Sequence, residues 1–462
     1  MKFSRIFVRT FKTSFNYRHS STVSNDHLVV LKTPSYDTKN ILENFNHKIV
    51  TAQKRGLPTN VIDQLYQIPE LQLQLQSISR HFNQLLNTKS RLQKELKLLG
   101  KNDEKLLSLK SQLKDLKEDE TKTKAEIRKI ESQLLPLLDL VPNDIDASVE
   151  KEEQIIRYLN PKDDYLADQS REHSTIGSNL GIIDLKTASI ISGTSWYYLI
   201  GDGALLEQAL IQYALKLARH HGFKMVIPPS IVRDEVASAC GFKPRDQNGE
   251  QQVYHLENSK LCLTGTAEIP LAGLGVGKVF KQNELPYRVV GLSRSYRAEA
   301  GSRGKDTKGI YRVHEFTKVE LFVWATETQS NEELEKLRKF QEDLIGSLNL
   351  SARVLNMPHH DLGAPAFKKY DIESWMPGRG SFGEVTSASN CTDYQSRRFQ
   401  TKYKNKDDGK NYFVHTLNGT AMAVPRVIAA IIENFYDSKL DAIKIPEVLQ
   451  PFMDDKKYIH KQ

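Results

Sequence analysis

Arginine and acidic residues gather near the middle of this 462-residue chain with types and spacing that could hold a nucleotide. Two strand-like runs, residues 292–299 and 312–325, flank the polar loop AGSRGKDTKG, and this pattern predicts an antiparallel hairpin. The chain contains no Walker GxxxxGK motif, no GxGxxG after a strand, no HExxH and no GxSxG. A nucleotide must therefore be held by arginines on a sheet, and not by a glycine-rich loop at a helix.

The cysteines give no indication of zinc. Cys240, Cys262 and Cys391 lie far apart in the chain, and none of them belongs to a CxxC pair. This spacing argues against a disulfide scaffold and a cysteine-rich zinc site, and it suits a reducing compartment. We therefore expect no zinc.

The elements that would position a nucleotide site lie in a mixed region that begins near residue 147. Strand-like runs, glycine turns and helical stretches alternate there, and we find no internal repeat of 20–50 residues. The expected elements are a helix over 203–221, a strand over 223–227 that stops at Pro228–Pro229, a strand over 412–417, a turn at Asn418–Gly419 and a helix over 424–436.

A different pattern precedes this body. Between residues 71 and 135 the apolar positions step by three and four, which predicts two long helices folding back on each other as an antiparallel coiled coil. The turn falls near Gly100, and Pro136 is expected to end the second helix. Lys89, Glu120 and Thr123 interrupt the apolar seam.

The charge of this arm favours a nucleic-acid partner. Residues 80–130 carry 14 lysines and arginines against 8 acids. A basic surface suits a polyanionic backbone because lysine and arginine displace its condensed counterions. A solvated helical face is the alternative interpretation of the same charges.

The first 25 residues look like a targeting segment. They contain five basic residues, eight serines and threonines and no acid. On a helical projection Phe3, Phe7 and Phe11 fall opposite Lys2 and Arg9, as in an amphipathic mitochondrial transit peptide. We expect residues 1–25 to be removed, and a frayed cationic tail is the alternative.

The composition excludes an integral membrane protein. The longest apolar runs, such as residues 427–432, fall far below the roughly 20 residues that span a bilayer. The formal net charge is +8, and most of this excess belongs to the leader and the arm. We therefore expect no membrane partner.

Four segments in order resemble the class II aminoacyl-tRNA synthetases, in the form found in seryl-tRNA synthetases. YRAEAGSRGKDTKGIYRVHEFTKVEL (296–321) is similar to motif 2, and VHTLNGTAMAVPRVIAAIIENF (414–435) is similar to motif 3. GTAEIPL resembles the serine-binding segment, residues 203–229 resemble the motif 1 dimer element, and the basic arm resembles the coiled coil that grips serine tRNA. The resemblance runs from about residue 30 to 455.

The resemblance implies an α+β fold, with an antiparallel catalytic sheet flanked by helices and an N-terminal coiled-coil arm. It implies three segments: a transit peptide over 1–25, a tRNA-binding domain over 26–146 and a catalytic domain over 147–462. The implied activity is ligation of L-serine to the 3′ end of tRNA(Ser) through seryl-adenylate. The implied setting is a homodimer in the mitochondrial matrix.

The family's catalytic arginines match Arg297 and Arg426. Arg297 would bridge the serine carboxylate and the α-phosphate of ATP, because its planar fork can hold two mutually repelling anions. Arg426 would hold the γ-phosphate. The matched serine-binding residues are Thr266, Ala267, Glu268, Arg297, Glu320, Asn418 and Thr420.

ATP is implied as a substrate and Mg²⁺ as its cofactor. Glu299 and the backbone near Val313 would read adenine, on which Phe316 would stack, and Glu384 with Ser387 would ligate Mg²⁺. The full set matched to ATP is Arg297, Ala298, Glu299, Val313, Phe316, Glu384, Val385, Thr386, Ser387 and Arg426.

Three positions depart from the family pattern. Ala421 and Pro425 replace glycines of motif 3, and Gly383 replaces an arginine often found before the metal-binding glutamate. Alanine restricts the backbone and proline removes an N–H group beside Arg426. The expected geometry of the motif 3 loop depends on how these residues are accommodated.

Two other functions share parts of this pattern. A catalytically inactive synthetase paralogue could act as an RNA-binding or assembly protein, although it would have no reason to keep Arg297, Glu268, Glu320, Glu384 and Arg426 together. An amino-acid:carrier-protein ligase could use the same catalytic domain, but it would need no long basic arm. A cytosolic location is the alternative to the mitochondrion.

Overall fold

The computed structural model describes residues 31, 33–98, 105–243, 251–299 and 309–462. The chain divides into a unit of residues 1–31 and a compact unit of residues 32–462. The expected transit peptide, the turn of the arm and the loop of motif 2 fall outside the described residues. Within those ranges, no helix is both long and apolar enough to cross a membrane.

A small helical domain forms the base of the arm. It contains α1 (Thr38–Glu43), α2 (Phe45–Lys54) and α3 (Thr59–Leu65), together with the ends of the two long helices. Their apolar faces meet in one core, because each short helix has only one apolar stripe to bury. The buried members of this core are Ile41, Ile49, Ala52, Leu65, Ile68, Leu134, Leu137, Leu138 and Val141.

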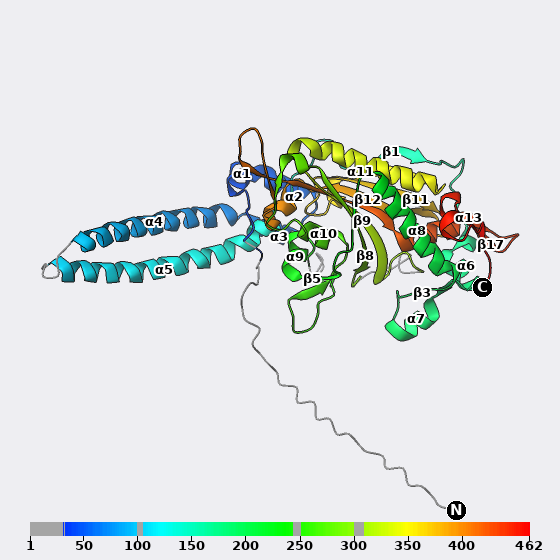
Figure 1. The fold of residues 1–462 in the computed structure, drawn as a ribbon, viewed down its shortest axis with the longest axis horizontal. Helices are drawn as coiled ribbons and strands as arrows, with labels where there is room; N and C mark the ends of the chain where they lie inside the picture. Colours follow the sequence, from blue (N-terminus) through cyan, green and yellow to red (C-terminus); the bar gives the residue numbers. More distant parts are fainter. Residues whose placement is uncertain (1–30, 32, 99–104, 244–250, 300–308) are drawn as a thin grey trace, which may run out of the picture. The chain divides into compact units, whose positions relative to one another are not determined.

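The two predicted arm helices are confirmed as α4 (Ile68–Leu98) and α5 (Lys105–Leu140), which lie side by side (Figure 1). The residues that interrupted the apolar seam partner each other, since Lys89 forms an ion pair with Glu120 across the two helices. Thr123 is buried in the same seam. A polar pair inside an apolar seam favours one register over its neighbours.

The expectation that Pro136 ends the second helix is wrong. α5 continues through Pro136 to Leu140. Proline removes one backbone hydrogen bond, but Leu134, Leu137 and Leu138 are buried in the core at the base of the arm. Burial of three leucines outweighs the lost bond, since each contributes roughly 1.5–3 kcal/mol.

The body is built on an eight-stranded sheet in the order β1-β10-β11-β12-β15-β9-β8-β4. Neighbouring strands are antiparallel except β4 and β8, which are parallel. This sheet confirms the expected α+β class. The strands are β1 (Gln154–Leu159), β4 (Lys224–Val226), β8 (Tyr287–Tyr296), β9 (Glu315–Ala325), β10 (Ala352–Asn356), β11 (Lys368–Met376), β12 (Ser381–Asn390) and β15 (His415–Ala423).

Strand β9 carries residues of the main hydrophobic core on one face and two expected or candidate site residues on the other. Its odd-numbered residues Val319, Leu321 and Val323 belong to the main core, which also contains residues of the helices α8 (Asp202–His220), α11 (Glu327–Ser347) and α13 (Val424–Phe435). Successive side chains of a strand point to opposite faces. The even-numbered residues Lys318 and Glu320 therefore lie on the other face, although they too are buried.

Shorter elements complete the body. The remaining helices are α6 (His173–Asn179), α7 (Leu185–Ser192), α9 (Asp234–Ala239), α10 (Glu268–Gly273) and α12 (Tyr394–Phe399), with 3-10 turns η1 (Gln169–Arg171), η2 (Gln282–Glu284), η4 (His359–Asp361) and η5 (Glu447–Phe452). The remaining strands are β2 (Ile183–Asp184), β3 (Tyr198–Leu199), β5 (Ile231–Arg233), β6 (Leu261–Leu263), β7 (Val279–Lys281), β13 (Lys402–Lys404), β14 (Asn411–Phe413), β16 (Tyr436–Asp437), β17 (Ala442–Lys444) and β18 (Tyr458–Ile459).

The sequence expectations for the body hold at most elements and fail at two. The single strand expected over 412–417 is wrong, because these residues are divided between β14 and β15, which belong to different sheets. The expected hairpin is the antiparallel pair β8–β9, and the helices expected over 203–221 and 424–436 are α8 and α13. The turn expected at Asn418–Gly419 is wrong, because both residues lie inside β15. Asn418 pairs with Phe322 and Gly419 with Leu321, so pairing with β9 overrides the local turn preference.

Candidate active site

A pocket opens where β9, β12, β15 and α13 meet. Seven residues expected to contact substrates contribute to its wall. They are Arg297, Glu299, Val313, Phe316, Glu384, Thr420 and Arg426. The wall also contains Tyr311, Arg312, Lys318, Ala423 and Pro425.

Arg297 follows directly after β8 and is held at both its backbone and its side chain. Its backbone N–H donates to the carbonyl of His314 (2.9 Å), and its Nε donates to the carbonyl of Gly265 (3.3 Å). The guanidinium carbon lies 5.2 Å from the ring centre of Phe316. Burial and the positive charge of Arg426 lower the pKa of Arg297. Two cations in one pocket favour binding of an anion between them.

Arg426 lies in the first turn of α13 and faces Glu384 on β12. Its Nη1 is 3.3 Å from the carboxylate of Glu384, and its Nε donates to the carbonyl of Tyr311 (3.4 Å). Burial opposes ionisation of Glu384, but Arg426 and Lys369 outweigh it and lower the pKa of this carboxyl to about 2. Glu384 is therefore an anion at neutral pH, on a pocket wall otherwise rich in cations.

A β-bulge brings Glu384 and Ser387 to the same face of β12. Glu384 pairs with Glu373 and Ser387 with Asp371, while the register shifts between them. The extra residue makes up for the three-residue spacing, which in a regular strand would point the two side chains to opposite faces. Burial raises the pKa of Asp371 to about 7, against the effect of Lys369 at 2.8 Å.

Glu384 and Ser387 supply oxygen ligands of the kind that Mg²⁺ takes when it also binds phosphate. A further carboxylate, Asp371, lies beside Ser387. These residues fit a hydrated ion that completes its coordination from phosphate and water. Among the described residues there is no group of three or more histidine, cysteine, aspartate and glutamate side chains able to enclose a metal.

Four residues expected to bind serine lie close together, with Thr420 in the pocket wall, and we call this group the serine region. All four are buried: Thr266, Glu268, Glu320 and Thr420. Strand pairing places Thr420 directly beside Glu320. Burial and then Glu320 raise the pKa of Glu268 to about 7, and burial also raises the pKa of Glu320. Two acids that repel each other favour a cationic substrate group between them.

The remaining expected residues do not belong to the pocket wall, although Asn418 hydrogen-bonds Glu268 in the serine region. Asn418 points toward Cys391, with its Nδ2 3.7 Å from the Sγ. Ala267 and Val385 are fully buried, and Thr386 bonds the carbonyl of Thr420. The N–H of Ala298 donates to the carbonyl of Gln252 (3.1 Å).

Lys318 was not predicted from the sequence, although it connects Glu320 with Thr266 in the serine region. Its Nζ is 2.7 Å from Glu320 and donates to the hydroxyl of Thr266 (3.1 Å). Its position two residues before Glu320 in a strand was the available signal, since such residues share a face. Gln395 was also missed, and it donates to Glu268 (2.7 Å) from a helix that is distant in sequence.

The departures from the family pattern are accommodated locally. Pro425 lies at the start of α13, where no backbone N–H is needed for the helix, and Ala421 is fully buried in the core. Gly383 lies against Tyr311, because a Cβ at this glycine would be 3.0 Å from the ring and hydroxyl of that tyrosine. Tyr311 in turn contacts Arg426 and Arg379 through its ring.

Comparison with known proteins places this geometry in a family. Residues 253–435 match the family described as tRNA synthetase class II core domain (G, H, P, S and T). The chain is 46% identical over 434 residues to the mitochondrial serine–tRNA ligase of Saccharomyces cerevisiae, covering 93% of this chain and 97% of that protein. It is 51% identical over 289 residues to the mitochondrial serine–tRNA ligase of Schizosaccharomyces pombe, covering 61% of this chain and 58% of that protein.

A solved structure agrees. The crystal structure of seryl-tRNA synthetase from Pyrococcus horikoshii complexed with ATP is similar with a TM-score of 0.81 and 32% identity, covering 92% of this chain and 99% of that one. These relatives support serine ligation and not an inactive paralogue. The chain therefore belongs to the class II aminoacyl-tRNA synthetases, as a serine–tRNA ligase of the mitochondrial type.

Proposed function

We propose that Arg297 and Arg426 carry out serine activation in the pocket described above. A serine carboxylate oxygen attacks the α-phosphorus of ATP, the bond to the bridging oxygen breaks, and pyrophosphate leaves. Arg297 holds the carboxylate and the α-phosphate together, and Arg426 holds the γ-phosphate. The convergence of two half-buried guanidiniums in one pocket supports these roles.

Selection of serine is assigned to the buried acids and hydroxyls. Glu268 pairs with the α-ammonium, while Glu320 and Thr420 hydrogen-bond the serine hydroxyl, with Thr266, Ala267 and Asn418 shaping the site. An analogue that lacks the hydroxyl leaves these groups unpaired, which costs roughly 10⁴–10⁵-fold in specificity. Alanine and glycine are rejected in this way, and threonine by its extra methyl group.

ATP is assigned to the part of the pocket wall that contains Glu299, Val313, Phe316 and Glu384. Glu299, Ala298 and the backbone at Val313 contact adenine, and Phe316 provides a stacking surface. Glu384 and Ser387, with the neighbouring backbone of Val385 and Thr386, would hold Mg²⁺, which would neutralise phosphate charge when bound. The positions of Glu384 and Ser387 on one face of β12 support this assignment.

The N-terminal part is assigned to tRNA(Ser), with domain limits of 26–146 for tRNA binding and 147–462 for catalysis. Exposed lysines and arginines cover both arm helices, including Arg91, Lys94, Lys114, Lys122 and Arg128. Such a surface binds a phosphate backbone in a salt-dependent manner. The amino acid then passes to the tRNA 3′ hydroxyl, which attacks the carbonyl carbon of the adenylate and releases AMP.

We assign a homodimer in the mitochondrial matrix. Large apolar side chains are exposed near the expected dimer element, with Ile227 87% exposed and Ile190 77% exposed. Exposed apolar surface of this kind is typical of a protein interface. Replacement of Ile227 by aspartate should shift the mass measured by light scattering from two chains to one. An unchanged dimer would remove Ile227 from the interface.

Serine-dependent ATP–pyrophosphate exchange tests the catalytic assignment. Arg297→Lys should lower the exchange rate by about 10²–10³-fold, because a point charge cannot hold two anions as a planar fork does. Lys278→Arg lies outside the pocket wall and serves as the control. Exchange that survives in Arg297→Lys at the wild-type rate would contradict the assignment.

A further inference from the structure

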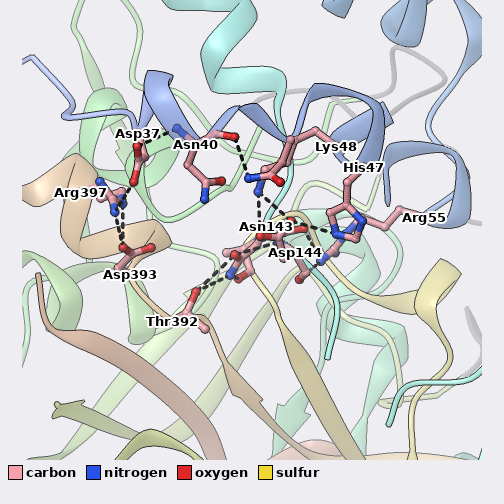
Figure 2. A network of polar contacts seen from close by, with 12 residues as sticks. Asp37, Asn40, His47, Lys48, Arg55, Asn143, Asp144, Thr392, Asp393 and Arg397 are labelled. Carbon is pink, nitrogen blue, oxygen red and sulfur yellow. Dashed lines mark hydrogen bonds and ion pairs between the residues drawn. The ribbon is translucent and has the colours of Figure 1, made fainter. Parts of the chain in front are cut away.

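The base of the arm joins the catalytic body through a network of polar contacts (Figure 2). The network includes residues of α1 and α2, the linker that follows α5 and the segment 391–397 of the body. Two of its members are Arg55, directly after α2, and Asn143, three residues after α5. Each contacts both the helical domain or its linker and the body.

Arg55 is a buried cation whose hydrogen bonds go to backbone carbonyls. It is 4% exposed. Its Nη2 donates to the carbonyls of Asn143 (2.9 Å), Asp144 (3.0 Å) and Ala366 (2.7 Å), and its Nη1 donates to Gly363 (2.9 Å). Burial lowers the pKa of Arg55 to about 10, so the side chain stays charged at neutral pH. One rigid fork therefore joins α2, the linker and the 362–366 loop.

Asn143 fixes the linker from the other side. Its Nδ2 lies within 2.9 Å of the carbonyl of Cys391 and the hydroxyl of Thr392, and 2.8 Å from the carbonyl of Pro365. Its backbone N–H donates to the carbonyl of Ala364 (2.9 Å). The end of α5 is thereby attached to the same loop that Arg55 contacts.

We call the contacts of Arg55 and Asn143 the clamp. The body segment that Asn143 contacts, which begins at Cys391, also supports the serine region. Asn418 contacts the Sγ of Cys391, whose carbonyl accepts from Asn143. Gln395, four residues further along, donates to Glu268 and accepts from Thr416 (2.8 Å). The arm is thus anchored to the wall of the serine region and not to a remote surface.

A small rotation at this base has a large effect at the tip of the arm. With about 1.5 Å rise per residue, the 31 residues of α4 extend about 46 Å, so a rotation of about 10° moves the tip by about 8 Å. Misplacement of a reacting group by only about 1 Å can cost about 10²-fold in rate. The clamp must therefore be stiff if a tRNA held by the arm is to present its 3′ end at the adenylate.

We propose that Arg55, with Asn143, is a positioning residue for the tRNA-dependent step, because it fixes the arm at one angle on the wall of the serine region. This inference rests on the proposed binding of tRNA by the arm. Adenylate formation needs no arm, so it should not depend on the clamp. Transfer of serine to tRNA should depend on the clamp.

The test compares two reactions in the full chain. In Arg55→Lys, a single ammonium replaces the fork and reaches only part of the carbonyl set. ATP–pyrophosphate exchange should stay within about twofold of wild type, while kcat/KM for tRNA in aminoacylation should fall by at least about tenfold. Parallel loss of both activities, or no loss of aminoacylation, would overturn the proposal.

Two further variants keep the result interpretable. Arg397→Lys changes an ion pair with Asp37 and Asp393 in the same network, but at a more exposed place, and should leave both activities within about twofold. Asn143→Ala removes the linker contacts and keeps Arg55, so it should reproduce the selective loss even if Arg55→Lys does not fold. Equal effects of Arg397→Lys and Arg55→Lys would also overturn the proposal.

Shortening the arm separates this inference from the function on which it rests. Replacement of residues 80–129 by a short turn keeps Leu75 and Leu134 in the basal core. If this variant charges tRNA normally, the arm does not bind tRNA productively and the proposed function of the arm fails. If it is impaired but Arg55→Lys in the full chain is not, only the role of Arg55 fails.

Discussion

At the scale of single residues, the serine region is defined by an imbalance of buried charge. Two carboxylates, Glu268 and Glu320, share one nearby ammonium, that of Lys318. Burial makes this excess negative charge costly in the free enzyme. In the proposed assignment a substrate ammonium would relieve this cost, so the burial and the repulsion by Glu320 that raise the pKa of Glu268 would also favour binding of serine.

This imbalance predicts a pH dependence of serine use. Because the pKa of Glu268 is raised to about 7, the carboxyl gains a proton as the pH falls through 7 and loses its attraction for the ammonium. The value of kcat/KM for serine, measured by pyrophosphate exchange, should fall on the acid side by up to about tenfold per pH unit and level off above pH 7. A bound ammonium lowers this pKa, so kcat should fall less.

Glu268→Gln provides the control for this profile. The variant should bind serine weakly and should lack the acid limb with a midpoint near 7. If the wild-type profile is flat from about pH 6 to pH 8, or if Glu268→Gln retains the limb, a different group controls the pH dependence.

Gly383 leads to a second prediction at this scale. A Cβ at Gly383 would press on Tyr311, whose carbonyl accepts from Arg426. Gly383→Ala should therefore raise KM for ATP several-fold, on the order of 1 kcal/mol, with little change in KM for serine. Gly346→Ala is the matched control, since nothing lies within 4 Å of its added Cβ. Equal changes in both KM values would point to general damage.

At the scale of elements, the ion pair in the arm has a testable role in register. Lys89 and Glu120 are each about one quarter exposed in a seam that is mostly apolar. Lys89→Glu places two acids opposite each other and should destabilise the arm by about 1 kcal/mol, as read from thermal unfolding. The exchanged pair Lys89→Glu with Glu120→Lys should restore the stability. Failure of the double variant to recover would show that the pair does not interact in solution.

At the scale of the whole molecule, the leader predicts a location that does not depend on the folded body. A fluorescent reporter carrying residues 1–30 should enter mitochondria, because the polarised inner membrane draws a basic amphipathic helix inward. Replacement of Arg5 and Arg9 by glutamine should reduce import, and so should replacement of Phe7 and Phe11 by serine. Import that survives both changes would show that neither face of the predicted helix is used.

The sequence by itself determined the elements whose pattern is local. Steps of three and four apolar residues defined the arm, and the paired strand-like runs defined β8 and β9. Arg297, Glu299, Arg426 and Glu384 were identified from short motifs, and they meet in one pocket. Their roles in catalysis remain predictions, because their positions alone do not measure a rate.

Only the tertiary structure decided features that depend on contacts between distant segments. Asn418–Gly419 forms a strand because β9 lies beside it, and α5 passes through Pro136 because its leucines are buried at the base of the arm. The bulge in β12 aligns Glu384 with Ser387, and Arg55 finds its acceptors more than 300 residues away at Gly363 and Ala366. Local propensities are worth about 1 kcal/mol for most residues and about 3 kcal/mol for a proline inside a helix, so burial of several side chains or strand pairing overrides them here.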